Sequence, residues 1–129
     1  MRFEAIRPSN VHETKGYSQA VRIGNTLYVS GQVPKDRSDR IVGVGDFEAQ
    51  ARQVYATLRA VLEAAGGSLD DVVKITTFLT RQDLFEDWRR IRAEVFKGEA
   101  HPASTLVVVA SLSHLDYLVE IEAIAVIDG

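Results

Sequence analysis

Alternating runs of apolar and polar residues predict six β-strands. The segment 17–33 has two β-rich halves on either side of Gly24-Asn25, a pair that tolerates the positive φ angles of a two-residue hairpin turn. The remaining strand-like runs are short and rich in apolar residues, and they cover 2–7, 71–79, 104–110 and 118–126. The sequence therefore predicts one hairpin and four further strands spread along the chain.

Two segments have the apolar spacing of amphipathic helices. In 47–65, apolar residues recur every three to four positions and form one face, with Asp46 as the expected N-cap and Gly66 as the stop. The segment 83–97 repeats this pattern and is expected to end at Gly98. Both helices need an apolar surface to cover, which the strands supply.

Strands and helices follow one another in the order β-β-β-α-β-α-β-β. Several strands with only two helices favour an α+β domain, in which a single β-sheet carries both helices on one face. Since there is no third helix to cover the other face, a homo-oligomer that packs sheet against sheet is the expected solution. No internal repeat or linker interrupts the 129 residues, and we interpret 1–129 as a single domain.

Composition removes several classes of function. The formal net charge of −3 gives no general attraction to phosphate backbones, so no nucleic-acid partner is expected. The chain has no cysteine and its three histidines lack metal-ligand spacing, so we expect no thiol nucleophile, no metal site and no cofactor. No apolar run has the length of a signal peptide or a membrane span, and we expect a soluble, cytoplasmic protein.

The last strand-like run is almost wholly apolar, yet it contains two carboxylates, Glu120 and Glu122. Alternate residues of a strand point to the same side of the sheet, about 7 Å apart. Because isolated carboxylates are expensive to bury, each must be solvated, paired or poised for a task. One interpretation is a carboxylate that orients water or moves a proton in a cleft. The other is a sheet face open to solvent, or an interface salt bridge.

Five stretches of the chain resemble the RidA/YjgF family, some of whose members carry the older label L-PSP endoribonuclease. They are "YSQAV", "YVSGQVP", "VLEAAGGSLDDVVKITTFL", "HPAST" and "VEIEAIAV", and together they span roughly residues 15–127 in order. The resemblance implies a chorismate-mutase-like fold and a homotrimer with its sheets packed inward. It also implies clefts between subunits in which reactive enamines or imines are deaminated.

The resemblance also assigns roles to individual residues. In this family the first glutamate of the "EIEAIA" stretch lines the cleft and positions the hydrolytic water, which makes Glu120 the candidate catalytic residue. Ser30 and Gly31 match the turn that offers backbone and hydroxyl groups to the ligand. Tyr17 matches a tyrosine that closes the pocket.

One stretch departs from the family pattern. Family deaminases usually read Pro-Ala-Arg-Ser where this chain has "HPAST", so Ser104 stands in the place of the arginine and Thr105 in that of the serine. An arginine grips a carboxylate bidentately, whereas a serine offers one neutral donor. Arg89 matches a helix residue near the cleft and is a candidate relocated cation. Alternatively, Arg89 pairs with an acidic neighbour such as Glu86, or the ligand has no carboxylate at that end.

These observations leave three hypotheses for the small-molecule site. The first is a hydrolase in which Glu120 orients water toward a C=N carbon, and the Gly31 backbone and the hydroxyls of Ser104 and Thr105 hold the substrate. The second is a non-catalytic trimer that binds a small metabolite, or a chaperone-like protein. The third, ribonuclease activity, fits badly with the net negative charge.

Overall fold

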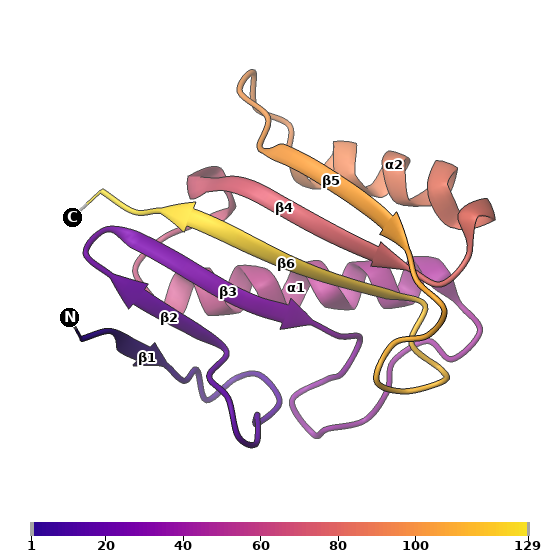
Figure 1. The fold of residues 1–129 in the computed structure, drawn as a ribbon, viewed down its shortest axis with the longest axis horizontal. Coiled ribbons are helices and arrows are strands. Elements are labelled where there is room, and N and C mark those ends of the chain that lie inside the picture. The colour runs from indigo at the N-terminus through magenta and orange to yellow at the C-terminus, as the bar shows by residue number, and fades with distance from the viewer. Residues whose placement is uncertain (1, 129) are drawn as a thin grey trace.

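A computed structural model of the protein describes residues 2–128. One six-stranded sheet, in the order β1-β2-β3-β6-β4-β5, forms the body of the molecule (Figure 1). The strands are β1 Glu4–Ile6, β2 Ala20–Ile23, β3 Thr26–Gln32, β4 Val72–Leu79, β5 Ala103–Val108 and β6 Val119–Val126, and the helices are α1 Phe47–Ala64 and α2 Phe85–Val95. The predicted order of strands and helices is confirmed.

Both helices lie behind the sheet in Figure 1 and leave its other face open. Neighbouring strands are antiparallel except for β4 and β5, which run parallel. They can do so because α2 connects them and returns the chain to the end of the sheet at which β4 begins. The expected α+β fold, with one sheet and two helices on one face, is thus confirmed. No helix within residues 2–128 is long and apolar enough to cross a membrane.

The first helix follows its sequence signals closely. Asp46 accepts a hydrogen bond from the backbone N–H of Ala49 and caps α1, and Gly66 takes a φ of +87° just after its end. The hairpin turn also forms where it was predicted, with Ile23 opposite Thr26. Only Gly24 of the turn pair has a positive φ, at +58°.

The second helix is shorter than predicted at both ends. Residues 82–84 form a 3₁₀ turn, and α2 ends at Val95 instead of continuing to Lys97. The reason is Phe96, which leaves helical geometry and buries its ring edge-on against Tyr55 of α1, with ring centroids 5.9 Å apart. Burial of one aromatic side chain therefore outweighs the helical pattern of the last turn.

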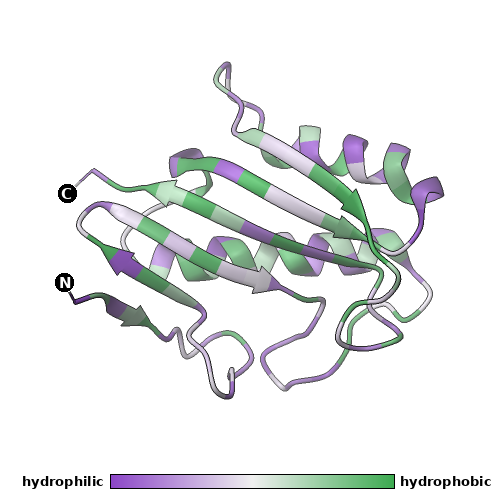
Figure 2. Cartoon of the chain, in the orientation of Figure 1, coloured by the Kyte–Doolittle hydropathy of each residue, from purple (hydrophilic) through white to green (hydrophobic). Residues whose placement is uncertain are grey.

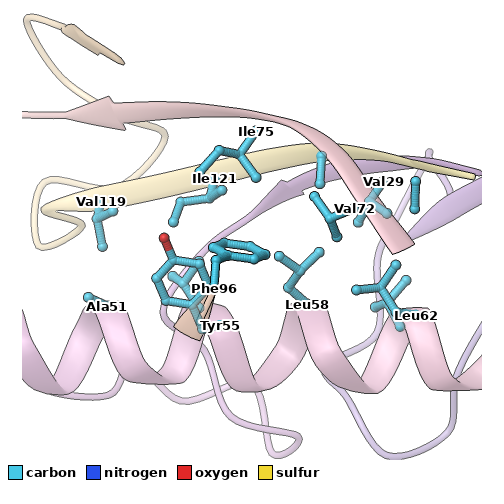
Figure 3. Close-up of a cluster of buried hydrophobic side chains, with 14 of the residues drawn as sticks. Val29, Ala51, Tyr55, Leu58, Leu62, Val72, Ile75, Phe96, Val119 and Ile121 are labelled. Atoms are coloured by element: carbon cyan, nitrogen blue, oxygen red, sulfur yellow. The ribbon is translucent and has the colours of Figure 1, made fainter. Parts of the chain in front are cut away.

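The core fills the space between α1 and the covered face of the sheet. Figure 3 shows Tyr55, Leu58 and Leu62 pointing from α1 toward Ile75 of β4 and Ile121 of β6. Leu58, Leu62, Ile75 and Ile121 are fully buried. In the hydropathy colouring of Figure 2, apolar residues recur along the central strands, and apolar and polar residues alternate along both helices.

We expect Leu58→Ala to lower the free energy of unfolding by about 2–5 kcal/mol, since it removes buried methyl groups and leaves a cavity against the sheet. Leu115→Ala is the matched control, because Leu115 is 88 % exposed and its loss should change stability by no more than about 0.5 kcal/mol. Urea unfolding at one protein concentration measures both. Equal effects of the two substitutions would contradict this description of the core.

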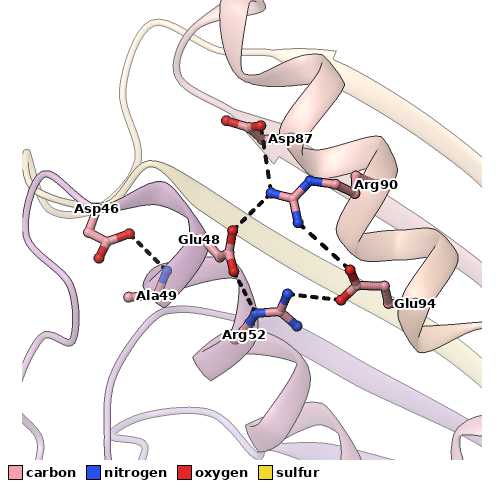
Figure 4. Close-up of polar contacts among 7 residues, drawn as sticks. All are labelled: Asp46, Glu48, Ala49, Arg52, Asp87, Arg90 and Glu94. Atoms are coloured by element: carbon pink, nitrogen blue, oxygen red, sulfur yellow. Dashed lines mark hydrogen bonds and ion pairs between the residues drawn. The ribbon is translucent and has the colours of Figure 1, made fainter.

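A network of ion pairs joins the outer sides of the two helices (Figure 4). Glu48 of α1 contacts Arg90 of α2 at 2.8 Å, and Arg52 contacts Glu94 at 2.8 Å. Glu48 and Arg52 also pair within α1 at 3.1 Å. These side chains are half exposed, so the network adds modestly to stability while it fixes how α2 lies against α1.

The face of the sheet away from the helices carries exposed apolar side chains. Tyr28 of β3, Val107 of β5 and Val126 of β6 are 40–46 % exposed, and register places them on the side opposite the core. Polar side chains share this face, among them Glu120 and Glu122. We refer to it as the open face.

Candidate functional site

Four of the residues predicted from the sequence line one cavity of about 740 Å³ at the open face. Glu120 comes from β6, Ser30 and Gly31 come from β3, and Tyr17 comes from the segment that precedes β2. Tyr17 is half exposed and is one of the residues that line the cavity. Residues more than a hundred positions apart in the sequence, Tyr17 and Glu120, thus line one cavity.

A β-bulge shapes this cavity. Between the pairs Val29–Ala123 and Gln32–Ile121, strand β3 has one residue more than β6, so Ser30 and Gly31 leave the regular ladder. The carboxylate of Glu120 rests directly on Gly31: a Cβ atom placed there would lie only 2.3 Å from Oε2. Glycine is therefore required at this position for the carboxylate to take its place.

Hydrogen bonds anchor the segment around Tyr17 to the bulge. The Ser30 hydroxyl donates to the carbonyl of Ser18 at 2.7 Å, and the Ser30 N–H donates to the carbonyl of Gln19 at 2.9 Å. The Gln32 amide donates to the Gln19 side chain at 2.9 Å. Because its proton is committed to Ser18, the Ser30 hydroxyl faces a ligand as an acceptor.

The electrostatics of Glu120 differ from those of an ordinary surface carboxylate. Burial raises the pKa of Glu120, and the negative charge of Glu122 two residues away raises this pKa further. A raised pKa makes the carboxylate a stronger base than free glutamate while leaving it at the edge of solvent. Glu120 therefore has the electrostatic setting of a proton acceptor.

The raised pKa has a consequence for stability. Glu120 holds its proton more tightly in the folded protein, so the free energy of unfolding is highest below the ordinary pKa of 4.5 and falls as the pH rises through the raised pKa. Glu120→Gln removes the partly buried charge, and we expect it to raise the free energy of unfolding at neutral pH. The gain should shrink toward about pH 4, where the wild-type carboxyl is protonated. Urea unfolding of both proteins across this range, at one protein concentration, measures it; a gain that grows with acidity would contradict the assignment.

The cavity also contains residues that the sequence analysis did not select. Lys35 contributes a cation, but Asp39 neutralises it at 3.0 Å, and this contact is the main cause that raises the pKa of Lys35. His12 is buried, and that burial lowers its pKa. Tyr117 lies just before β6 with its ring covered. Nothing in local sequence pattern marks these residues, because loops far apart in sequence bring them together.

Three predicted residues lie outside this cavity in the single chain. Arg89 is exposed on α2 and reaches Glu86 at 3.9 Å, which is the ordinary pairing considered from the sequence. Thr105 is on the open face of β5, where Lys74 donates to its hydroxyl. Ser104 pairs in register with the buried Ile75 and so lies on the helix-covered side of the sheet.

No group of three or more histidine and acidic side chains within residues 2–128 is arranged to hold a metal ion. The cavity offers the carboxylates of Glu120 and Glu122, hydroxyls, backbone groups, the Lys35–Asp39 ion pair and a second lysine, Lys15. Such a set can bind a small polar molecule, orient water and accept a proton.

Comparison with known proteins identifies the family. The model of the family described as endoribonuclease L-PSP matches residues 8–127. A RutC family protein of Pyrococcus horikoshii is 45 % identical over 95 % of this chain and 96 % of its own length. A protein of Dermatophagoides farinae named 2-iminobutanoate/2-iminopropanoate deaminase is 37 % identical over 87 % of this chain and 86 % of its own.

Solved structures agree with this. The Rid family protein YyfA of Yersinia pestis matches with a TM-score of 0.93 and 38 % identity, over 98 % of this chain and all of its own. The YjgF gene product of Escherichia coli matches with a TM-score of 0.87 and 35 % identity, over 95 % and 98 %. The fold is thus that of a class of small α+β proteins with one mixed sheet and two helices. This chain is a member of the endoribonuclease L-PSP family, the family that includes the YjgF and Rid proteins.

Proposed function

We propose that the protein hydrolyses reactive imines or enamines, with Glu120 as the catalytic residue. The observation that carries this proposal is the placement of Glu120, whose half-buried, more basic carboxylate rests on the Gly31 bulge at the floor of an open cavity. The name of the Dermatophagoides farinae relative, an iminobutanoate and iminopropanoate deaminase, supports the same reaction class.

The reaction follows from the groups in the cavity. Glu120 accepts a proton from a water molecule as the water oxygen bonds to the C=N carbon, and it passes this proton to the nitrogen, which gives a carbinolamine. Glu120 then takes the proton of the carbinolamine hydroxyl and delivers it to the nitrogen as the C–N bond breaks. Imine and water thereby become a carbonyl compound and ammonia. The Gly31 backbone lies beside the carboxylate, where it can hold the substrate.

We propose that the working form is a homotrimer packed through the open face. The exposed Tyr28, Val107 and Val126 support this, because large apolar side chains exposed on one sheet face mark interaction surfaces. Ser104 and Glu120 lie on opposite sides of one sheet, so only a second copy can bring them into one site. Sedimentation equilibrium should give three times the chain mass of 14.3 kDa; a monomer would refute this arrangement.

The proposed reaction is tested with a panel of freshly generated imines, with and without a carboxylate. Because imines hydrolyse unaided, the measured quantity is the rate of carbonyl release above the protein-free rate. We expect the wild-type protein to accelerate at least one imine. No acceleration anywhere in the panel would remove the deaminase function for these substrates.

The alternative is a non-catalytic protein that binds a small metabolite in the same cavity, and one observation favours it. Lys35 and Asp39 form an ion pair within the cavity, and this pair offers a ligand hydrogen-bond donors and acceptors without a free base. In that case a carbonyl or imine analogue would bind with an affinity that does not depend on Glu120. This alternative would be supported if the analogue binds saturably to Glu120→Gln and the wild-type protein hydrolyses no imine.

A further inference from the structure

One buried histidine, His12, plays no part in the reaction proposed above. Its side chain is 5 % exposed and lines the cavity that contains Glu120. It also lines a second cavity of about 410 Å³, so it forms part of the wall between the two. Its Nδ1 atom is buried and has no hydrogen-bond partner within residues 2–128. A buried polar atom without a partner calls for an explanation.

A chain of hydrogen bonds connects His12 to the β-bulge. The amide nitrogen of Gln19 donates to the backbone carbonyl of His12 at 2.8 Å and lies 3.5 Å from Nε2 of the His12 ring. The side-chain oxygen of Gln19 accepts from the amide nitrogen of Gln32 at 2.9 Å, and this nitrogen also donates to the carbonyl of Ser30 at 3.0 Å. Ser30 belongs to the bulge on which the Glu120 carboxylate rests. Two buried glutamines thus link His12 to the catalytic carboxylate.

The carbonyl of Ser30 fixes the direction of the protons along this chain. Since a carbonyl can only accept, the group of Gln32 beside it must be the NH2 group. The group of Gln19 that faces Gln32 must then be its oxygen, and its NH2 group must face His12. Nε2 of His12 is therefore the unprotonated, accepting nitrogen, and the single ring proton lies on Nδ1. This arrangement requires a neutral histidine.

Protonation of His12 disturbs the chain of hydrogen bonds. A proton on Nε2 points at the NH2 group of Gln19, and two donors cannot form a hydrogen bond with each other. Turning the Gln19 amide over would place its oxygen against the His12 carbonyl and its NH2 group against that of Gln32. The mismatch then reaches Gln32 and its bond to the Ser30 carbonyl. A charged His12 is therefore incompatible with the bulge as it stands.

The surroundings of His12 also oppose a charge on it. Burial lowers the pKa of His12 below its ordinary value of 6.5, and the ammonium group of Lys35 lowers this pKa further. The carboxylate of Asp39 acts in the opposite direction, but Lys35 binds it at 3.0 Å. The phenols of Tyr17 and Tyr117 line the same cavity. The other charged side chains that line the two cavities are those of Arg7, Glu13, Lys15, Arg37, Glu120 and Glu122. Basic and acidic groups balance among them, so burial and Lys35 decide the direction.

We propose that His12 is a positioning residue for Glu120. The hydrogen-bonded chain holds the bulge in place only while His12 is neutral. This proposal rests on the proposed function for its effect on the reaction rate. One proton at His12, away from the reacting atoms, then moves the catalytic carboxylate from a supported to an unsupported position. Imine hydrolysis should accordingly require that both His12 and Glu120 are free of their protons.

The experiment follows the backbone amide signal of Gly31 by NMR in the Glu120→Gln variant, as the pH is lowered from about 8 to about 4. This variant removes the titration of Glu120 itself, whose side chain lies against Gly31. We expect the Gly31 signal to shift with the same midpoint as the ring C–H signals of His12. The shift should disappear when His12→Gln is added. It should be unchanged when His101→Gln is added, since His101 is exposed and lines neither cavity.

A further variant separates the hydrogen-bonded chain from the charge of His12 acting through space. Gln19→Met removes the amide between His12 and Gln32 and keeps a side chain of similar length. We expect His12 still to titrate and the Gly31 signal to lose the matching step. The proposal would be overturned by a Gly31 step that persists in Gln19→Met, or by a Gly31 signal that does not follow His12 in Glu120→Gln.

The rate of imine hydrolysis gives an independent readout. Below both pKa values the wild-type rate should fall by up to about a hundredfold per pH unit, because two protons are taken up, and the rate of His12→Gln by about tenfold. His12→Gln keeps a side-chain acceptor for Gln19, whereas His12→Phe offers none. At about pH 8 we expect His12→Phe to be about tenfold slower than His12→Gln, mainly in kcat.

The two proposals fail in different ways. The NMR titration needs no turnover, so a Gly31 step that follows His12 upholds the link to the bulge even if no imine is hydrolysed. In that case the deaminase function alone is lost. Conversely, hydrolysis that depends on Glu120 but falls equally steeply with acid in wild type and His12→Gln would uphold the reaction and overturn the role of His12.

Discussion

Glu120→Gln is expected to lower the catalysed rate of imine hydrolysis by about 100- to 10,000-fold, the range that a positioned general base contributes. The amide has nearly the same shape as the carboxylate but cannot accept a proton from water. The variant should stay folded, since the substitution removes a partly buried charge that burial and Glu122 both disfavour. The measurement is the initial rate of carbonyl release, corrected for the protein-free reaction.

The matched control is Glu122→Gln, two residues further along the same strand and on the same face. Removing the Glu122 charge should lower the pKa of Glu120 toward its ordinary value and make it a weaker base. We expect a loss of no more than about tenfold. A larger loss of activity in Glu122→Gln than in Glu120→Gln would show that Glu122, and not Glu120, is the catalytic carboxylate.

Gly31→Ala is expected to have the second largest effect, a loss of about 100-fold in activity with the fold preserved. The new Cβ would meet Oε2 of Glu120 at 2.3 Å and its Cδ at 2.8 Å, so the carboxylate must move away. The atoms it meets belong to a side chain that can swing aside, and a displacement of about 1 Å is enough for such a loss. Activity and circular dichroism, measured on the same preparation, check the expected loss of activity and the preserved fold.

Gly98→Ala provides the comparison, because a Cβ at Gly98 meets nothing within 4 Å and no positive φ is required there. It should keep full activity. Full activity of Gly31→Ala would mean that the contact between Gly31 and Glu120 does not position the reactive carboxylate.

The sequence predicted most of the fold because its local signals agreed with the tertiary structure. Asp46 and Gly66 mark the ends of α1 as expected, and the turn at Gly24 sets the register of the hairpin. The prediction failed at the last turn of α2, where Phe96 packs on Tyr55. That contact joins residues 41 positions apart and has no local signature.

The candidate site was predictable only in part. Glu120 could be found because a carboxylate in an apolar strand needs an explanation, and the resemblance added Tyr17, Ser30 and Gly31. The residues around them come from distant loops, so their approach depends on topology rather than on spacing.

The central claim is that Glu120 catalyses imine hydrolysis in this cavity. Its most direct test is the initial rate of 2-iminobutanoate hydrolysis by wild type and by Glu120→Gln, side by side and relative to the protein-free rate. The account predicts clear acceleration by wild type and a rate with Glu120→Gln that approaches the uncatalysed one. Equal acceleration by the two proteins would contradict it.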